Sequence, residues 1–257
     1  MCGRVWFEIS SGVGCQERRN DPHKWPHVMV EGIGNFDEYV NSYSDELEKA
    51  LGGFGGDIPY YARRKVAILV SSMKGILPSV IIDFGSGTGS LIPHLHDFFP
   101  KAQIIATDVS RLALRHIQNE YPYVEICEPE KLEPQSCDLI VMSCVIHHIP
   151  VDSRVDVLQK IHSALKTNGS LCIFEHNPIN PVTRKIVSNC IFDEGVELIT
   201  KKSLSKLIKK VGGFSQIKNG YFLFFPPALK YFCPLERVLY WLPLGGQHFA
   251  RLIKNKE

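Results

Sequence analysis

The sequence contains eight cysteines but no CxxC pair, and no apolar run approaches the roughly 20 residues of a membrane span. Scattered cysteines argue against a disulfide framework. Residues 1–25 also lack the apolar stretch of a signal peptide. From these absences we expect a cytoplasmic protein with free thiols.

A strong overall charge is also missing, because the net charge of the 257 residues is only +2. The charges are nevertheless uneven, with eleven Lys and Arg in residues 200–257 against Glu236 and Glu257. Such a basic region is typical of a solvated surface, and it also fits attraction to an anionic substrate or membrane face.

The hydrophobic pattern predicts an irregular N-terminal extension over residues 1–35 and one α/β domain over residues 36–257. Helices are expected over residues 36–51 and 59–73, followed by alternating strands and helices. Repeated βαβ units predict a parallel sheet covered on both faces. The expected strands are residues 80–84, 103–107, 124–127, 139–143 and 170–174, with helices over 90–98, 111–120 and 152–166 between them.

Two further strand-like segments, residues 215–225 and 246–256, follow a helix that Thr200 caps. We expect them to pair antiparallel at the sheet edge, which completes a doubly wound, seven-stranded sheet. The insertion between them, residues 226–246, has Leu235, Val238, Leu239 and Leu242 at the spacing of a short amphipathic helix.

The stretch "IIDFGSGTGS", residues 81–90, places three glycines between the first strand and its helix. A glycine turn here lets the bare backbone approach a ligand closely. A Walker loop needs a lysine that is absent near Gly89, and the dinucleotide pattern GxGxxG needs a glycine where Ser90 stands. A nicotinamide dinucleotide stays open as an alternative ligand at this point.

This stretch resembles motif I of class I S-adenosylmethionine-dependent methyltransferases. The segment ending "CDLIVMSCVIHHIP" is similar to the "LHHIP" strand end of small-molecule members, and "FDEYVNSY", residues 36–43, is similar to the aromatic segment that covers their cofactor. The resemblance implies that S-adenosylmethionine is the cofactor and that Asp83 receives its ammonium group. It also implies that Asp108 takes the ribose hydroxyls. The cofactor-binding residues implied are Asp83, Gly85, Ser86, Gly87, Gly89, Asp108, Val109, Glu128, Pro129 and Ser143.

Histidines cluster where the fourth and fifth strands end, and ligands of this fold lie over these ends. His148, His147 and His176 are therefore candidate bases, because imidazole titrates near neutral pH. With Glu175 they could also ligate a metal, but metal-dependent O-methyltransferases typically use an acid-rich set, so we expect no metal. Arg184 is either a substrate clamp or a surface residue.

These features predict methyl transfer to a small-molecule acceptor, with oxygen favoured over carbon or nitrogen. No motif or stacking platform for nucleic acid is present. Residues 226–246 are a candidate for weak contact with a membrane surface or a lipid-linked acceptor. An NAD-dependent oxidoreductase and a catalytically silent cofactor-binding protein stay open, and the sequence gives no oligomeric state.

Overall fold

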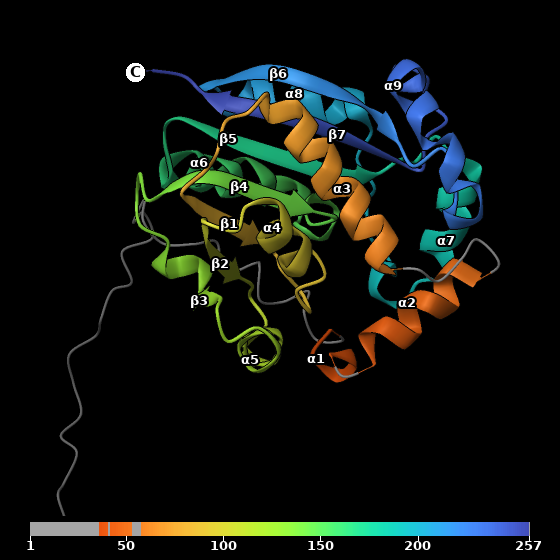
Figure 1. Ribbon diagram of the computed structural model, residues 1–257, viewed down its shortest axis with the longest axis horizontal. Coiled ribbons are helices and arrows are strands. Elements are labelled where there is room, and N and C mark those ends of the chain that lie inside the picture. Colours follow the sequence, from red (N-terminus) through yellow and green to blue (C-terminus); the bar gives the residue numbers. More distant parts are fainter. Residues whose placement is uncertain (1–35, 41, 53–57, 257) are drawn as a thin grey trace, which may run out of the picture.

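The computed structural model describes residues 36–40, 42–52 and 58–256, so the predicted extension over residues 1–35 lies outside the described residues. The centre of the molecule is one seven-stranded sheet with the order β3-β2-β1-β4-β5-β7-β6 (Figure 1). Its strands are β1 Val80–Phe84, β2 Gln103–Thr107, β3 Glu125–Cys127, β4 Cys137–Ser143, β5 Leu165–His176, β6 Phe214–Phe222 and β7 Gln247–Lys254.

Strands β1 to β5 run parallel, with β1 paired to both β2 and β4. Strand β7 is antiparallel to β5 and to β6. These pairings confirm the predicted doubly wound α/β sheet and the antiparallel pairing at its edge. Because parallel strands end on the same side, the residues that follow β1, β2, β4 and β5 meet along one edge of the sheet.

Helices cover both faces of the sheet, as alternating side chains on buried strands require. Ile81 packs on one face with α3, α4 and α5, whereas its neighbour Ile82 packs on the other with α6 and α8. Both side chains are fully buried. The helices are α3 Ile58–Met73, α4 Ile92–Phe98, α5 Arg111–Glu120, α6 Arg154–Ala164 and α8 Lys201–Val211.

Shorter elements gather at the carboxyl ends of the parallel strands. Helix α2 contacts both α3 and α7 there. None of the helices in the described part of the chain is long and apolar enough to cross a membrane. These elements are the helices α1 Phe36–Tyr39, α2 Tyr43–Leu51, α7 Pro181–Asn189 and α9 Glu236–Leu239, with 3-10 turns over Pro129–Lys131, Ile146–His148, Val151–Ser153, Ile191–Asp193 and Pro227–Leu235.

Two predicted helices have different bounds. The helix expected over residues 36–51 is interrupted, because a turn in which the Ser42 N–H donates to the Tyr39 carbonyl separates α1 from α2. The helix expected to reach residue 166 ends at Ala164, because Leu165 is extended and pairs with Cys137 of β4. Asn168, with a φ of 63°, lies within β5.

The insertion over residues 226–246 is less helical than predicted. Pro234 lies inside a 3-10 turn, and the α-helix that follows has only four residues. Leu235 and Val238 are exposed, so the predicted apolar face is not packed against the domain. The insertion is instead anchored through Glu236, whose carboxylate accepts from Arg64 at 2.6 Å and from the Phe224 N–H at 3.0 Å.

Candidate functional site

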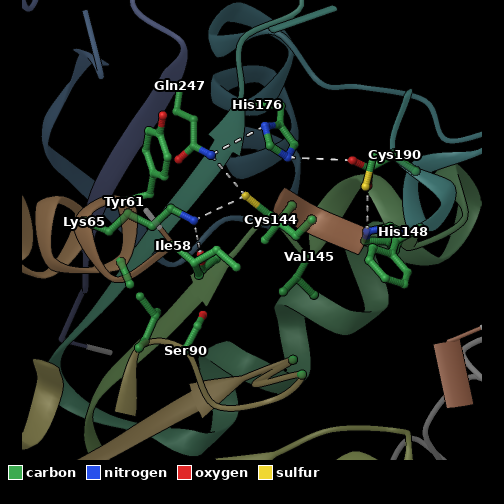
Figure 2. Close-up of a pocket in the computed structure, with 18 of the residues that line it drawn as sticks. Ile58, Tyr61, Lys65, Ser90, Cys144, Val145, His148, His176, Cys190 and Gln247 are labelled. Carbon is green, nitrogen blue, oxygen red and sulfur yellow. Dashed lines mark hydrogen bonds and ion pairs between the residues drawn. The ribbon is translucent and has the colours of Figure 1, made fainter. Parts of the chain in front are cut away.

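A cavity of about 870 Å³ lies at the carboxyl ends of β1, β2, β4 and β5. Its volume is in the range of cofactor and substrate sites. Its wall is formed by the glycine loop, α2, α3, the turn after β4, the loop after β5 and residues 223–226. Figure 2 shows the part of the wall around α3, the turn after β4 and His176.

The glycine loop has the backbone conformation that its sequence predicts. Gly85 has a φ of 70°, and a side chain there would place Cβ 2.6 Å from Cγ2 of Val145. Gly87 has a φ of 53° and donates its N–H to Asp108 at 2.8 Å. Gly85, Ser86 and Gly87 line the cavity. Gly89 is not among the lining residues, and the space beside it is filled by Ile92, Tyr121 and Ile117 of neighbouring helices.

Asp83 is the clearest candidate for holding a cationic ligand. It lies in β1, one residue before the strand ends at Phe84, and lines the cavity with 2% of its surface exposed. Its Oδ2 atom has no hydrogen-bond partner among the described residues. Burial, assisted by the nearby Asp108 carboxylate and opposed by Lys65, raises the pKa of Asp83 to about 7. A buried carboxylate oxygen without a donor is costly unless a ligand supplies one, so this atom fits the ammonium group expected of S-adenosylmethionine.

Most of the other cofactor-binding candidates lie where the resemblance implies. Asp108, Val109, Pro129 and Ser143 line the cavity. Glu128 does not, because its carboxylate pairs with Arg111 at 3.2 Å and with Lys131 at 3.4 Å. Of these two neighbouring candidates, Pro129 lines the cavity and Glu128 faces the two cations.

The aromatic segment before the glycine loop covers this end of the cavity. Tyr43 lines the cavity and stacks on Phe192 with ring centroids 4.8 Å apart, and Tyr39 meets the same ring edge-on at 5.8 Å. On α1, Asp37 accepts a hydrogen bond from the Ser110 hydroxyl, which caps α5. The segment with Tyr39 and Tyr43 and the turn with Phe192, which are distant in the sequence, thus pack together over the end of the cavity expected to hold the cofactor.

His147 is buried behind the cavity wall and is not among the lining residues. Its Nδ1 lies 2.5 Å from Oε2 of Glu175, whose Oε1 accepts from the Val145 and Ile146 N–H groups. Burial opposes a charge on either group. The attraction between His147 and Glu175 outweighs burial, and Asp193 adds to it at the histidine. The pKa of His147 therefore rises to about 10 and that of Glu175 falls to about 2.

His148 and His176 do line the cavity, and Asp193 lies between them. Asp193 Oδ1 is 3.3 Å from the Nε2 atoms of both His147 and His148, and its Oδ2 is 4.0 Å from Nε2 of His176. The structure therefore brings all three predicted histidines around one carboxylate that the sequence analysis did not select. Glu175 orients only His147.

A second polar cluster joins the site beside His176. Cys144 has a φ of 60°, and its Sγ lies 3.5 Å from Nε2 of Gln247 and 3.6 Å from Nζ of Lys65 (Figure 2). Burial alone would raise the pKa of the Cys144 thiol, but His176 and Lys65 lower it to about 6. Lys65 also donates to the Ser143 hydroxyl at 2.7 Å. The wall beside the predicted methyl position therefore carries a lysine and a polarised thiol.

The loop after β5 positions the insertion and not a substrate clamp. Arg184 is exposed and is not among the cavity residues. Asn177 instead donates to the Gly245 carbonyl at 2.8 Å, and Thr183 donates to the Gly246 carbonyl at 2.8 Å. The "EHNPINP" segment thus fixes the base of residues 226–246, next to the lining residues Phe224 and Phe225.

Comparisons with known proteins identify methyltransferases among the proteins similar to this chain. Residues 82–171, which span the glycine loop through most of β5, match the model of a family described as "Methyltransferase domain". A carboxy-S-adenosyl-L-methionine synthase of Psychrobacter arcticus is 28% identical over 155 residues, 55% of this chain and 59% of the relative. An uncharacterised methyltransferase of Alkaliphilus oremlandii is 23% identical over 54% of this chain and 64% of its own length. The chain thus spans less than two thirds of these curated relatives.

Solved structures share the fold at low identity. An S-adenosylmethionine-dependent methyltransferase of Thermotoga maritima aligns over 89% of this chain and 100% of its own, with a TM-score of 0.60 and 17% identity. A phosphoethanolamine N-methyltransferase of Haemonchus contortus, in complex with S-adenosylhomocysteine and phosphomonomethylethanolamine, aligns over 89% of this chain and 60% of its own, with a TM-score of 0.58 and 18% identity. The overall fold is therefore that of class I methyltransferases.

Proposed function

We propose that this chain is an S-adenosylmethionine-dependent methyltransferase acting on a small-molecule acceptor, with oxygen as the accepting atom. The observation that carries the proposal is Asp83, a buried carboxylate that lines the cavity with the glycine loop and Asp108 and whose Oδ2 has no hydrogen-bond partner among the described residues. The cofactor supplies an electrophilic methyl group when it is bound. The matching methyltransferase domain over residues 82–171 supports the same ligand.

The chain's own residues contribute orientation and proton transfer. Asp83 would hold the ammonium group and Asp108 the ribose hydroxyls, which fixes the methyl group near the ends of β4 and β5. Positioning of this kind can supply roughly 7–11 kcal/mol of the barrier reduction in well-oriented cases. His148 and His176 line the cavity and are the candidate bases, whereas His147 is placed to hold Asp193.

The most direct test combines methyl-labelled S-adenosylmethionine with a small-molecule extract and identifies the labelled products by mass spectrometry. We expect a labelled methyl ether. Replacement His148→Ala should lower kcat by about 10²–10⁴-fold if this histidine is the base. His96→Ala, on the exposed part of α4, is the matched control. Turnover that is equal in both variants would remove His148 from the mechanism, and binding without any product would favour a silent cofactor-binding protein.

The relatives named carboxy-S-adenosyl-L-methionine synthase suggest a second candidate, modification of the cofactor itself. Lys65 favours it, because its ammonium faces the cavity beside Ser143 and suits a carboxylate-bearing co-substrate. Mass spectrometry of the nucleoside products separates the two candidates. Methyl transfer yields S-adenosylhomocysteine, whereas this alternative yields a carboxylated cofactor.

The insertion over residues 226–246 supports weak contact with an anionic membrane that holds the acceptor. Its outer side exposes large apolar groups, including Tyr231 at 84% and Trp241 at 63%, beside the exposed Lys230 and Arg237. Apolar and basic groups together favour an anionic lipid surface. We expect Trp241→Ser to reduce sedimentation with anionic liposomes, whereas Leu77→Ser, at another exposed apolar position, should not. Equal sedimentation of both variants would contradict this surface.

The cellular location proposed is the cytoplasm. Every cysteine of the described residues is a free thiol, which agrees with a reducing compartment. Nucleic acid is not proposed as a partner.

A further inference from the structure

We infer that His147, His148 and Asp193 form a binding site for one divalent first-row transition-metal ion. One ligand atom from each of these residues lies within 4.8 Å of the others. This inference revises the expectation of no metal, which rested on the lack of an acid-rich ligand set. It does not depend on the methyltransferase activity.

The two histidine–aspartate distances match the separation of ligand atoms in a metal site. Nε2 of His147 and Nε2 of His148 each lie 3.3 Å from Oδ1 of Asp193. Charge-assisted N–H···O bonds are about 2.7–2.9 Å long, so both contacts are longer than such bonds. In a tetrahedral site with bonds of about 2.0–2.1 Å, neighbouring ligand atoms are separated by about 3.3 Å.

The hydrogen bonds of His147 fix which of its nitrogens can ligate. Glu175 Oε1 accepts two backbone N–H groups, so Oε2 is left to accept from Nδ1 of His147. In the neutral ring, Nε2 then carries a lone pair that points at the Asp193 carboxylate. The ring's own proton or a metal ion that displaces it then lies between the two atoms. A carboxylate behind a ligating histidine is also the usual partner that orients it in metal sites.

The charges around the cluster favour one metal ion over several protonated rings. Glu175 is fully buried and the Asp193 side chain is 9% exposed, so two negative charges lie in a space with little solvent. Protonation of both His147 and His148 would bring two like charges together, because their ring centroids are 4.2 Å apart. One divalent ion balances both carboxylates without that repulsion.

The ligand set and its position indicate the class of ion. Two imidazoles and one carboxylate suit zinc, iron, cobalt or nickel, and not magnesium or calcium, which prefer oxygen ligands. His148 and Asp193 line the cavity, so the remaining coordination positions face it, and His176 lies 4.0 Å from Asp193 as a further candidate ligand. In the metal-loaded protein His148 is a ligand, and His176 is then the candidate base.

The test measures zinc bound to the chelator-treated full chain by equilibrium dialysis and elemental analysis, without cofactor or acceptor. We expect one Zn²⁺ per wild-type chain beyond any background. That ion should be absent in Asp193→Asn and in His148→Ala, and retained in His96→Ala. Glu175→Gln should weaken affinity by about 10–100-fold, as expected of a residue that orients a ligand. Because cysteines elsewhere can also bind Zn²⁺, the difference between wild type and variants is the relevant quantity.

Cobalt provides a second readout that does not rely on stoichiometry. Co²⁺ in a tetrahedral site absorbs strongly in the visible region, so the wild-type chain should develop these bands and Asp193→Asn should not. Circular dichroism and thermal melting check that each variant is folded. Equal zinc binding by folded wild type and variants, or no binding by the wild type, would overturn the inference. Metal binding without methyl transfer would instead refute only the proposed function.

Discussion

Replacement of Asp83 by asparagine should make the fold more stable relative to wild type at pH 8 than at pH 5, and should weaken cofactor binding. Folding raises the pKa of Asp83 from 3.8 to about 7, chiefly through burial, with Asp108 assisting and Lys65 opposing. The neutral acid is therefore the form that the folded protein prefers. As pH rises from 3.8 to 7, ionisation of Asp83 progressively destabilises the cofactor-free protein, and above pH 7 the full cost is present.

The magnitude follows from the size of the shift. About three pKa units correspond to about 4 kcal/mol at 1.36 kcal/mol per unit. At pH 5 about 1.5–2 kcal/mol of that cost is already present, so about 2–3 kcal/mol is added between pH 5 and pH 8. The variant does not titrate there. Its amide brings a pH-independent cost of about 1–3 kcal/mol for donors without partners, which cancels when the two pH values are compared.

Urea unfolding of both proteins at pH 5 and pH 8, without cofactor, gives the required quantity. Relative to wild type, Asp83→Asn should gain about 2–3 kcal/mol in unfolding free energy on going from pH 5 to pH 8. Calorimetry should show its affinity for S-adenosylmethionine reduced by about 10–100-fold, since a charge-assisted hydrogen bond is lost. A stability difference that is the same at both pH values, or an unchanged cofactor affinity, would refute the reasoning.

The remaining predictions concern the glycine loop and the polarised thiol. Gly85→Ala should lower stability by about 1–3 kcal/mol and impair cofactor binding, because its Cβ would lie 2.6 Å from Val145. Gly195 has a similar φ of 74° but open space around it, so it provides the control. In thermal melts Gly195→Ala should lose only the backbone cost of about 1 kcal/mol. Equal losses of stability in both variants would contradict the clash with Val145. Cys144, with its pKa lowered to about 6, should be alkylated by iodoacetamide at a rate that falls steeply below pH 6. Lys65→Met should raise this pKa and slow the reaction at pH 7. Mass spectrometry that follows labelling of Cys144 measures both effects, and the absence of both would contradict the prediction.

Local sequence patterns were sufficient to predict the first two strands of the sheet and the helix that follows them. Strands Val80–Phe84 and Gln103–Thr107 and helix Arg111–Glu120 have the predicted bounds. The apolar runs of these strands are buried in the sheet, and Ser110 caps the helix by accepting from the Ala113 N–H. Strong periodicity and a local cap depend on neighbouring residues alone, so the sequence contains that information.

The cavity residues Asp193 and Lys65 could not be predicted in the same way. Asp193 follows α7 in a 3-10 turn with no motif around it, and only the return of this segment over the sheet brings it to the histidines. Lys65 resembles any lysine on an amphipathic helix until the end of β4 is placed beside it. Contacts between distant segments decided both positions.

Asp108 holds the glycine loop through Oδ2, which accepts from the Gly87 N–H, while its Oδ1 accepts from the Ser110 N–H at the start of α5. The loop is therefore preorganised, and less conformational entropy is lost when a ligand binds. One carboxylate thus shapes the loop and is also expected to contact the ribose. An affinity loss in an Asp108 variant would combine both effects, so it would overestimate the strength of the ribose contact alone.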